Sequence, residues 1–262
     1  MEDSVVIKLG KIYFASDLHL GVNAIKSSHE RELIFCQWLE EISADADRIF
    51  LLGDLFDFWF EYGSAVPKGF TRTLGALARC SDAGIQIDLF TGNHDLWMKD
   101  YLVNEIGLKL HYNPIQTDLM GRRFLIGHGD GLGPGDHGYK MMKKIFVHPV
   151  SKFLYRWLHP DIGIPLASYF SSVSRKSQLM VKDYLGHEKE WLINFVEEVS
   201  ATSNFDYFIF GHRHLPIDYK LKNNSSRYIN TGDWLVHQSY AEFDGQKLNL
   251  RFYKNDYGKI FS

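Results

Sequence analysis

Cysteine is scarce in this 262-residue chain, and Cys36 and Cys80 alone cannot form a disulfide framework. A single bridge between them remains open, but a reducing cytoplasm is the expected environment. No apolar run approaches the roughly 18 residues that are needed to span a bilayer. The first residues lack a basic stretch followed by an apolar core, so we expect no signal peptide. These absences predict a cytoplasmic protein that is soluble or at most peripheral to a membrane.

An excess of positive charge is also missing. The formal net charge is -3, which argues against a general nucleic-acid binder, because affinity for the phosphate backbone requires clustered Lys and Arg. Histidine, by contrast, is plentiful, with 12 residues, and this favours a metal site. The length and the hydrophobic content of 45% allow one large domain with a modest insertion.

Short apolar runs, each closed by a polar cluster, recur along the chain. They are too short for helices and rich in Ile, Phe, Leu and Tyr, and each ends in Gly, Asp, Asn or His, so we predict buried strands that run into loops. The predicted segments are 11–19, 47–57, 85–95, 122–130 and 205–214. Helical patterns lie between several of them, which predicts an α/β fold whose ligands collect beyond the carboxyl ends of the strands.

Two helical patterns and the C-terminal third complete the predicted core. The pattern over 30–42 places Leu33, Trp38, Leu39 and Ile42 near one face, and 189–199 has a similar apolar stripe. The C-terminal third reads as strands joined by short turns, with a hairpin signal at 244–246. We therefore expect an antiparallel addition to the sheet system.

The segment 136–184 has no strand pattern and mixes bulky apolar residues with Lys and Arg. Pro149, Pro160 and Pro165 are predicted to break it into short helices. One interpretation is a helical edge packed on the core. The other is a lid with an apolar inner face for a greasy ligand and basic residues for phosphate or membrane. The predicted organisation is a core of residues 1–135 and 185–262 with a helical lid insertion at 136–184.

Five polar clusters follow the predicted strands. In chain order they are D-x-H (Asp17, His19), G-D-x-x-D (Asp54, Asp57), G-N-H-D (Asn93, His94, Asp95), G-H (His128) and G-H-x-H (His212, His214). Carboxylate, imidazole and amide oxygen suit Mn, Fe or Zn, and the lack of cysteine ligands argues against structural zinc. Seven ligands suit two ions bridged by one carboxylate, which would also neutralise Asp54 inside its apolar surroundings. Such a pair suits in-line displacement at phosphorus.

This order of motifs, from Asp17 to His214, resembles the calcineurin-like metallophosphoesterase superfamily. The resemblance implies a four-layer sandwich of two mixed β-sheets flanked by helices. It implies further that one metal is held by Asp17, His19, Asp54 and His214, and the other by Asp54, Asn93, His128 and His212, with Asp54 bridging. By the same resemblance Asp54 and His94 are catalytic, since His94 matches the histidine that contacts phosphate and assists the leaving group. Asp57 and Asp95 look like residues that orient the ligands.

A narrower resemblance rests on the stretch 128–139, H-G-D-G-L-G-P-G-D-H-G-Y, and the basic–apolar insert that follows. It is similar to the UDP-2,3-diacylglucosamine hydrolase family of lipid A synthesis, in which this motif opens a helical lid over the acyl chains. The resemblance implies that substrate is bound by Asn93, His94, Asp136, Ser174 and Arg175. In the best-known branch an arginine stands at the position of His94 and a threonine at that of Arg213. We interpret Arg213 either as the replacement cation or as a solvated loop residue.

The function implied is hydrolysis of the diphosphate of UDP-2,3-diacylglucosamine to UMP and 2,3-diacylglucosamine 1-phosphate. A metal-activated water would attack the uridine-side phosphorus, with two Mn ions favoured and Fe, Zn or Mg as alternatives. The expected partner is this lipid-linked sugar nucleotide, with peripheral contact to the cytoplasmic face of the inner membrane and neither nucleic acid nor an obligate protein partner. One alternative is an enzyme that acts on another nucleotide diphosphate or phosphodiester, but a small polar substrate would not need the apolar insert. The other is a non-catalytic binding scaffold of the same fold, which typically lacks one of the metal ligands or the histidine of G-N-H-D.

Overall fold

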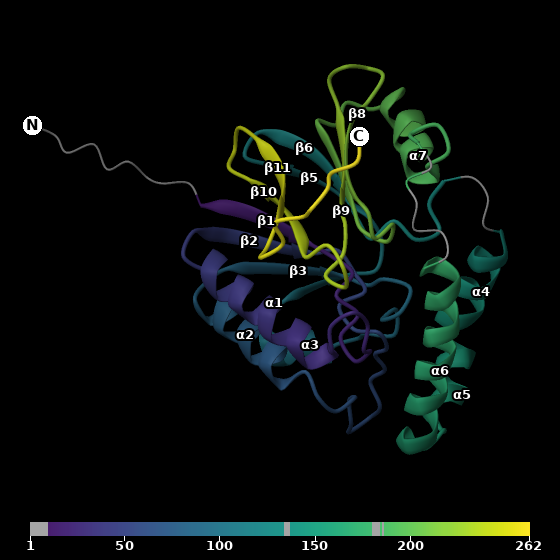
Figure 1. Cartoon of the computed structure of the whole chain (residues 1–262). Coiled ribbons are helices and arrows are strands. Elements are labelled where there is room, and N and C mark those ends of the chain that lie inside the picture. The colour runs from purple at the N-terminus through teal and green to yellow at the C-terminus, as the bar shows by residue number, and fades with distance from the viewer. Residues whose placement is uncertain (1–9, 134–136, 180–183, 185) are drawn as a thin grey trace, which may run out of the picture.

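Two β-sheets packed face to face form the centre of the molecule, and helices cover their outer faces (Figure 1). The computed structural model describes residues 10–133, 137–179, 184 and 186–262, with the backbone alone over 172–179. Within this part, the four layers are helices, six-stranded sheet, five-stranded sheet and helix. The predicted α/β sandwich of two mixed sheets is thereby confirmed.

The six-stranded sheet has the order β11-β10-β1-β2-β3-β4. Its strands are β1 (Lys11–Ala15), β2 (Ala46–Leu51), β3 (Gln86–Phe90), β4 (Lys109–His111), β10 (Ser239–Phe243) and β11 (Leu248–Phe252). The first four run parallel, so their carboxyl ends meet at one edge. β10 pairs antiparallel with β1, with Phe243 opposite Ile12, and β11 continues antiparallel. The predicted antiparallel addition is confirmed.

The five-stranded sheet has the order β5-β6-β7-β9-β8. Its strands are β5 (Ile115–Leu119), β6 (Arg122–Ile126), β7 (Tyr207–Phe210), β8 (Pro216–Lys220) and β9 (Arg227–Thr231). The neighbours β6, β7 and β9 run parallel, while β5 and β8 are antiparallel edges. The loops after β6, β7 and β9 therefore leave this sheet at one end.

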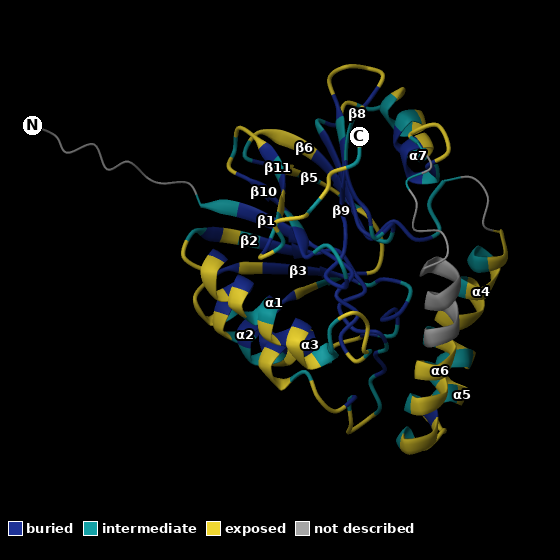
Figure 2. Cartoon of the chain, viewed as in Figure 1, coloured by how far each residue is buried: buried dark blue, intermediate teal, exposed yellow. Residues whose placement is uncertain are grey.

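The central strands are buried on both faces, which explains their continuous apolar runs. In β1, Phe14 points into the layer between the sheets, where it stacks on Phe50 at 5.1 Å and on Phe124 of the other sheet at 6.1 Å. Its neighbour Tyr13 points the other way and packs edge-on against Trp38, 6.2 Å away, under the helices. Figure 2 shows the resulting buried strands in dark blue.

The outer face of the six-stranded sheet is covered by α1 (Ser28–Ile42), α2 (Thr71–Asp82) and α3 (Tyr101–Ile106). A capping box between Ser27 and Glu30 starts α1, because each side chain bonds the other residue's backbone N–H. The predicted place of Leu33 on the core face is wrong, since Leu33 is 40% exposed and Phe35 is buried instead. Phe35 fits the spacing of three and four residues that leads to Trp38 and Ile42, whereas Leu33 lies two residues out of step.

In the described part of the segment between β6 and α7 (Trp191–Ser200) there are three helices, and α7 covers the second sheet. They are α4 (His137–Val147), α5 (Pro149–Arg156) and α6 (Pro160–Leu179), which lie together in Figure 1. Pro149 and Pro160 stand at helix starts, but Pro165 lies inside α6, so its predicted helix break is wrong. In the second turn it removes only the bond to a first-turn carbonyl. Among the described residues, no helix combines the length and the apolar content needed to cross a bilayer.

Candidate metal centre

The polar clusters predicted from sequence follow β1, β2, β3, β6 and β7, and their loops converge at one end of the two sheets. Five of these positions have a left-handed backbone, with φ of 55° at Asp17, 46° at His19, 51° at Asp54, 67° at His212 and 55° at His214. Such angles cost energy for residues that have a Cβ, and they concentrate at functional sites.

Glycines in the motifs let the loops approach one another. A Cβ on Gly92 would lie 2.6 Å from the backbone nitrogen of Asp54 and 2.1 Å from its carboxylate. A Cβ on Gly211 would lie 2.5 Å from Ser16 Oγ. The glycines of G-N-H-D and G-H-x-H are therefore required by close contact between loops.

One group of candidate ligands consists of Asp17, His19 and His214, whose ligand atoms all lie within 4.8 Å of one another. The Nε2 of His214 is 3.4 Å from Asp17 Oδ1, and the Nε2 of His19 is 3.8 Å from the same oxygen. Since Asp17 and His19 are fully buried, the group forms an enclosed set of donors on the β1 side of the cluster.

A second group contains Asp54, His128 and His212, again within 4.8 Å. The Nε2 of His128 is 3.4 Å from Asp54 Oδ2, 3.3 Å from Asn93 Oδ1 and 3.2 Å from His212 Nδ1. Asp54 Oδ2 also lies 3.6 Å from His19 Nε2, so one carboxylate oxygen stands between the two groups. The structure thus brings all seven predicted ligands together.

Several buried polar atoms in this cluster lack a hydrogen-bond partner in the described structure. They include Asp17 Oδ1, His19 Nε2 and His94 Nε2. Burying such atoms without a partner costs free energy, and a coordinated cation would satisfy them. Carboxylate oxygens and imidazole nitrogens are ligands of divalent cations. The residues present therefore fit divalent metal ions.

The charges in the cluster shift its pKa values strongly. Burial alone would raise the pKa of Asp17, but nearby His214 and His19 outweigh it and lower this pKa to about 2. Burial opposes the charged form of His128, yet the Asp54 carboxylate raises its pKa to about 10. Burial lowers the pKa of His94 to about 4, so His94 is neutral at pH 7. The field around Asp54 therefore attracts cations, which is the condition that a metal centre requires.

His94 is connected to the inserted helices through Ser171 of α6. The Nδ1 of His94 is 2.7 Å from Ser171 Oγ, which also donates to Asp57 Oδ2 at 2.9 Å and to Asp57 O at 3.0 Å. Ser171 is not predicted from the sequence, because a serine in a helix 77 residues from His94 carries no signal of its own. This contact joins the insertion to the cluster.

Three carboxylates surround the candidate ligands. Asp57 Oδ1 is 3.3 Å from His19 Nδ1, and Asp233 Oδ2 is 3.2 Å from His214 Nδ1, so each can fix the orientation of an imidazole. Asp95 accepts backbone N–H bonds from Leu55 at 2.8 Å and Gly92 at 2.7 Å, which ties two loops together. Asp233 was not among the predicted site residues, although it shares their position just after a strand.

The predicted substrate contacts in the insertion fall beyond what the structure describes. Asp136 lies outside the described residues, and the side chains of Ser174 and Arg175 do so as well. Arg213 is buried, and its guanidinium donates from Nε to Glu190 Oε2 at 2.7 Å and from Nη2 to Glu190 Oε1 at 2.9 Å. Its interpretation as a solvated loop residue is therefore wrong. A carboxylate 23 residues away holds the guanidinium, over the ring of Trp191.

Two stacked mixed sheets with Asp, His and Asn side chains beyond their parallel strands form the site of a calcineurin-like metallophosphoesterase. A scan of family models gave no match. UDP-2,3-diacylglucosamine hydrolase of Porphyromonas gingivalis is 41% identical over 253 residues, which cover 92% of this chain and 96% of that protein. The proteins of that name from Shewanella loihica and Pseudomonas syringae are 26% and 28% identical, each over 91% of this chain and 94% of its own length. The chain belongs to the UDP-2,3-diacylglucosamine hydrolase family, and it is a hydrolase.

Solved structures overlap with the fold more loosely. An archaeal phosphodiesterase has a TM-score of 0.48 at 13% identity, covering 92% of this chain and 98% of its own. Yfce, a phosphoesterase from E. coli, has a TM-score of 0.47 at 15% identity, covering 93% of both chains. These scores add nothing to the family assignment, which rests on sequence.

Proposed function

We propose that this protein hydrolyses the diphosphate of UDP-2,3-diacylglucosamine, giving UMP and 2,3-diacylglucosamine 1-phosphate. The observation that carries the proposal is the cluster of candidate metal ligands around Asp54, joined by Ser171 to an apolar helical insertion. The name of the Porphyromonas gingivalis relative supports the substrate. A polar site for the diphosphate beside an apolar segment for acyl chains suits both halves of such a molecule.

We infer that Asp54 is shared between two metal sites. Asp17, His19 and His214 would complete one site, and Asn93, His128 and His212 the other. The position of Asp54 Oδ2, 3.6 Å from His19 Nε2 and 3.4 Å from His128 Nε2, supports this division. Two divalent cations bound there, with Mn favoured over Fe, Zn and Mg, would act as Lewis acids at phosphorus and lower the pKa of water.

His94 is the proposed proton donor and phosphate contact. Since Ser171 gives its proton to the Asp57 carboxylate, the proton of neutral His94 must sit on Nδ1, where it bonds Ser171 Oγ. The buried Nε2 is then bare. A diphosphate placed at Nε2 brings negative charge, which raises the pKa of His94 and favours the imidazolium. The Nε2–H formed in this way can donate to a phosphate oxygen or to the leaving group.

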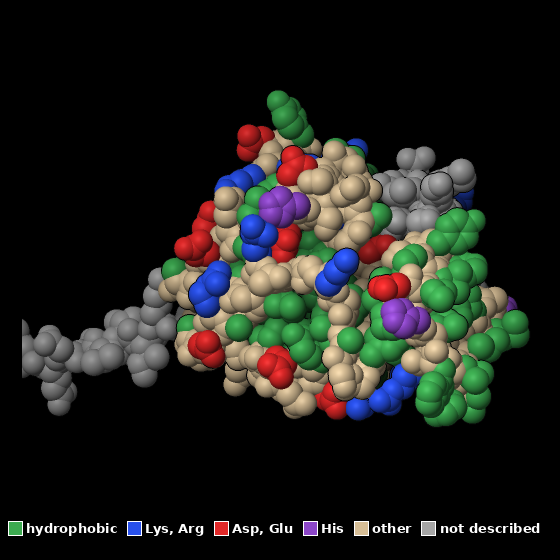
Figure 3. All heavy atoms as spheres, turned by 90° about the horizontal axis from the view of Figure 1, so that it is seen from below, with side chains coloured by type: hydrophobic (Ala, Val, Ile, Leu, Met, Phe, Trp, Pro, Cys, Tyr) green, Lys and Arg blue, Asp and Glu red, His purple; other side chains and the backbone are tan. Residues whose placement is uncertain are grey.

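We infer that residues 136–184 form a lid over the acyl chains and touch the cytoplasmic face of the inner membrane. Large apolar side chains are exposed along the three inserted helices, with Trp157 at 76%, Met141 at 64% and Leu154 at 63%. Figure 3 shows hydrophobic side chains gathered along the edge where α4–α6 lie. Contiguous apolar surface of this kind marks a binding face, and nearby lysines favour an anionic lipid surface.

The test is UMP release from UDP-2,3-diacylglucosamine in detergent with Mn(II). A deacylated UDP-sugar and bis(p-nitrophenyl) phosphate serve as comparison substrates. We expect strong preference for the acylated substrate, because only that substrate fills the apolar insertion. Equal or better turnover of the other two would reject the lipid substrate while leaving the metal centre in place.

A further inference from the structure

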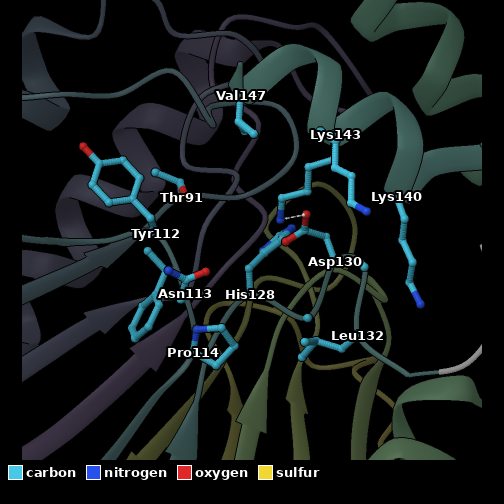
Figure 4. Close-up of a pocket in the computed structure, with 14 residues that line it drawn as sticks. Thr91, Tyr112, Asn113, Pro114, His128, Asp130, Leu132, Lys140, Lys143 and Val147 are labelled. Atoms are coloured by element: carbon cyan, nitrogen blue, oxygen red, sulfur yellow. Dashed lines mark hydrogen bonds and ion pairs between the residues drawn. The ribbon is translucent and has the colours of Figure 1, made fainter. Parts of the chain in front are cut away.

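A cavity of about 460 Å³ opens beside the candidate metal centre (Figure 4). One wall is the loop after β4, residues 112–114, and the opposite wall is α4, which contributes Lys140, Lys143 and Lys144. His128 and Asp130 lie between these walls. The volume falls within the range of about 300–1,000 Å³ that small-molecule sites occupy.

Among the described residues that line this cavity, three are lysines and one, Asp130, is a carboxylate, so positive charge is in excess there. That carboxylate is already compensated, because Asp130 Oδ2 accepts bonds from Lys143 Nζ, 2.5 Å away, and from the Tyr139 hydroxyl. Lys140 also lines the cavity, and its Nζ bonds the carbonyl of Gly133 at 2.5 Å. The cavity therefore suits an anion rather than a neutral apolar ligand.

Two helices of the insertion reach the metal centre at different residues. Ser171 of α6 contacts His94. The helix α4 lines the cationic cavity together with His128, whose Nε2 lies 3.4 Å from Asp54 Oδ2. A substrate whose diphosphate lies at the centre would extend one half toward each of these helices. The polar, anionic half matches the cavity.

We propose that this cavity binds the nucleoside monophosphate half of a nucleotide diphosphate substrate. The α4 lysines contact its phosphate, and the ring of Tyr112 stacks on its base. Tyr112 is half exposed, and its hydroxyl donates to the carbonyl of Met98 at 3.2 Å, which holds the ring in place. The proposal deepens the proposed function and rests on it for the chemistry at the diphosphate.

The first experiment measures UMP binding by calorimetry to the Mn-loaded full-length protein. Lys140→Gln/Lys144→Gln should weaken UMP binding at least about tenfold and raise KM more than it lowers kcat, because charged hydrogen bonds are lost in binding. Lys144→Gln alone, at an exposed side chain, should keep the fold and show part of the loss. Unchanged UMP affinity in both variants would overturn the proposal.

A matched control removes two lysines elsewhere. Lys222 and Lys247 are exposed in turns at the opposite end of the sheets, because Lys220 pairs with the start of β9 and Phe243 with the start of β1. Lys222→Gln/Lys247→Gln makes the same change in net charge and should leave UMP affinity within about twofold. An equal loss in this control would assign the effect to general electrostatics and overturn the lysine contacts.

Tyr112 gives a second test that separates base from phosphate. Tyr112→Ala should weaken UMP binding about fivefold and leave ribose 5-phosphate unaffected, because base–aromatic stacking is lost. Tyr112→Phe keeps the ring and should bind UMP like the parent. Equal losses for both ligands in Tyr112→Ala would overturn the stacking contact.

The outcomes also separate this proposal from the proposed function. If the parent hydrolyses UDP-2,3-diacylglucosamine but the substitutions of the lysines and Tyr112 leave UMP affinity and KM unchanged, the cavity assignment is rejected and the proposed function stands. If the lipid substrate is not hydrolysed while UMP binding depends on those residues, the cavity assignment stands and the lipid assignment fails.

Discussion

The candidate metal centre and the inserted helices handle apolar and polar groups in opposite ways. At the centre, Asp17, His19 and Asp54 are at most 1% exposed, although their side chains are polar. In the insertion, Trp157 and Phe170 are 76% and 62% exposed, although they are apolar. The centre is thus a buried polar cluster, whereas the insertion presents an exposed apolar surface of the kind that marks a binding face.

The two regions meet through hydrogen bonds and aromatic contacts. The indole N–H of Trp97 donates to the Phe146 carbonyl at 2.8 Å, and the ring of Trp97 lies 4.7 Å from that of Tyr155. Ser171 joins α6 to His94. Substitutions at positions away from these contacts can address each region separately.

The largest effect is expected at the centre. Asp54→Ala should reduce phosphoesterase activity to below about a thousandth, because both proposed metal sites lose a shared ligand. Secondary structure by circular dichroism should change little. Metal content, measured after dialysis, should fall with activity. Asp118→Ala, at an exposed position of β5, should behave like the parent. Activity above about a tenth would reject a shared carboxylate.

The insertion should respond in a way that depends on the substrate. Leu154→Ser/Trp157→Ser should raise KM for the acylated substrate about tenfold and leave turnover of bis(p-nitrophenyl) phosphate unchanged, because only acyl chains or lipid need the apolar surface. Leu33→Ser, which changes an exposed leucine of α1, is the matched control and should have no effect. Equal losses of activity on both substrates would contradict a role of the insertion that is specific to the acylated substrate.

A smaller effect is expected where the regions meet. Ser171→Ala should lower kcat about tenfold, because His94 loses the acceptor that fixes its Nδ1 proton. KM should change less than kcat, and the pH profile of kcat should shift with the altered histidine. Ser64→Ala, at an exposed loop position, serves as the control. A normal kcat and an unchanged pH profile would show that Ser171 only packs α6.

The smallest effect concerns stability beneath the centre. Burial would raise the pKa of Asp88, but hydrogen bonds from His111 and Arg48 outweigh it and lower this pKa. The stabilisation is therefore present above the unfolded-state pKa near 4 and is lost as the pH falls through the lower folded-state value. Asp88→Asn should reduce the free energy of unfolding by about 1–2 kcal/mol at pH 7. In urea denaturation, a difference from the parent that stays constant down to pH 2 would contradict this account.

Much of the fold could be predicted because the strands are buried on both faces and end in motif residues. Asp17, Asp54 and Asn93 come together because the loops after the parallel strands β1, β2 and β3 share one edge of their sheet. His128 follows β6 of the facing sheet and joins them at the same end. The strands β4 and β5 and the helices α2 and α3 were not predicted. β4 has 3 residues and α3 has 6, too few for a periodic pattern.

The contacts that sequence could not supply are those between distant segments. Ser171 reaches His94 across 77 residues, and Glu190 holds Arg213 across 23. The sequence separation of neither pair predicts a contact, because both contacts depend on how helices pack at the ends of the sheets. The α4 lysines likewise read as a solvated helix face until the loop at 112–114 is seen opposite them.

The left-handed backbone at five candidate ligands has a consequence for how this sequence can change. Glycine would relax each of those positions, so a population selected for thermal stability alone should accumulate glycines there and lose metal and activity together. Selection for the reaction must keep rejecting such variants. The strained backbone of these loops is therefore kept by selection for the reaction, although glycine at the same positions would make the fold more stable.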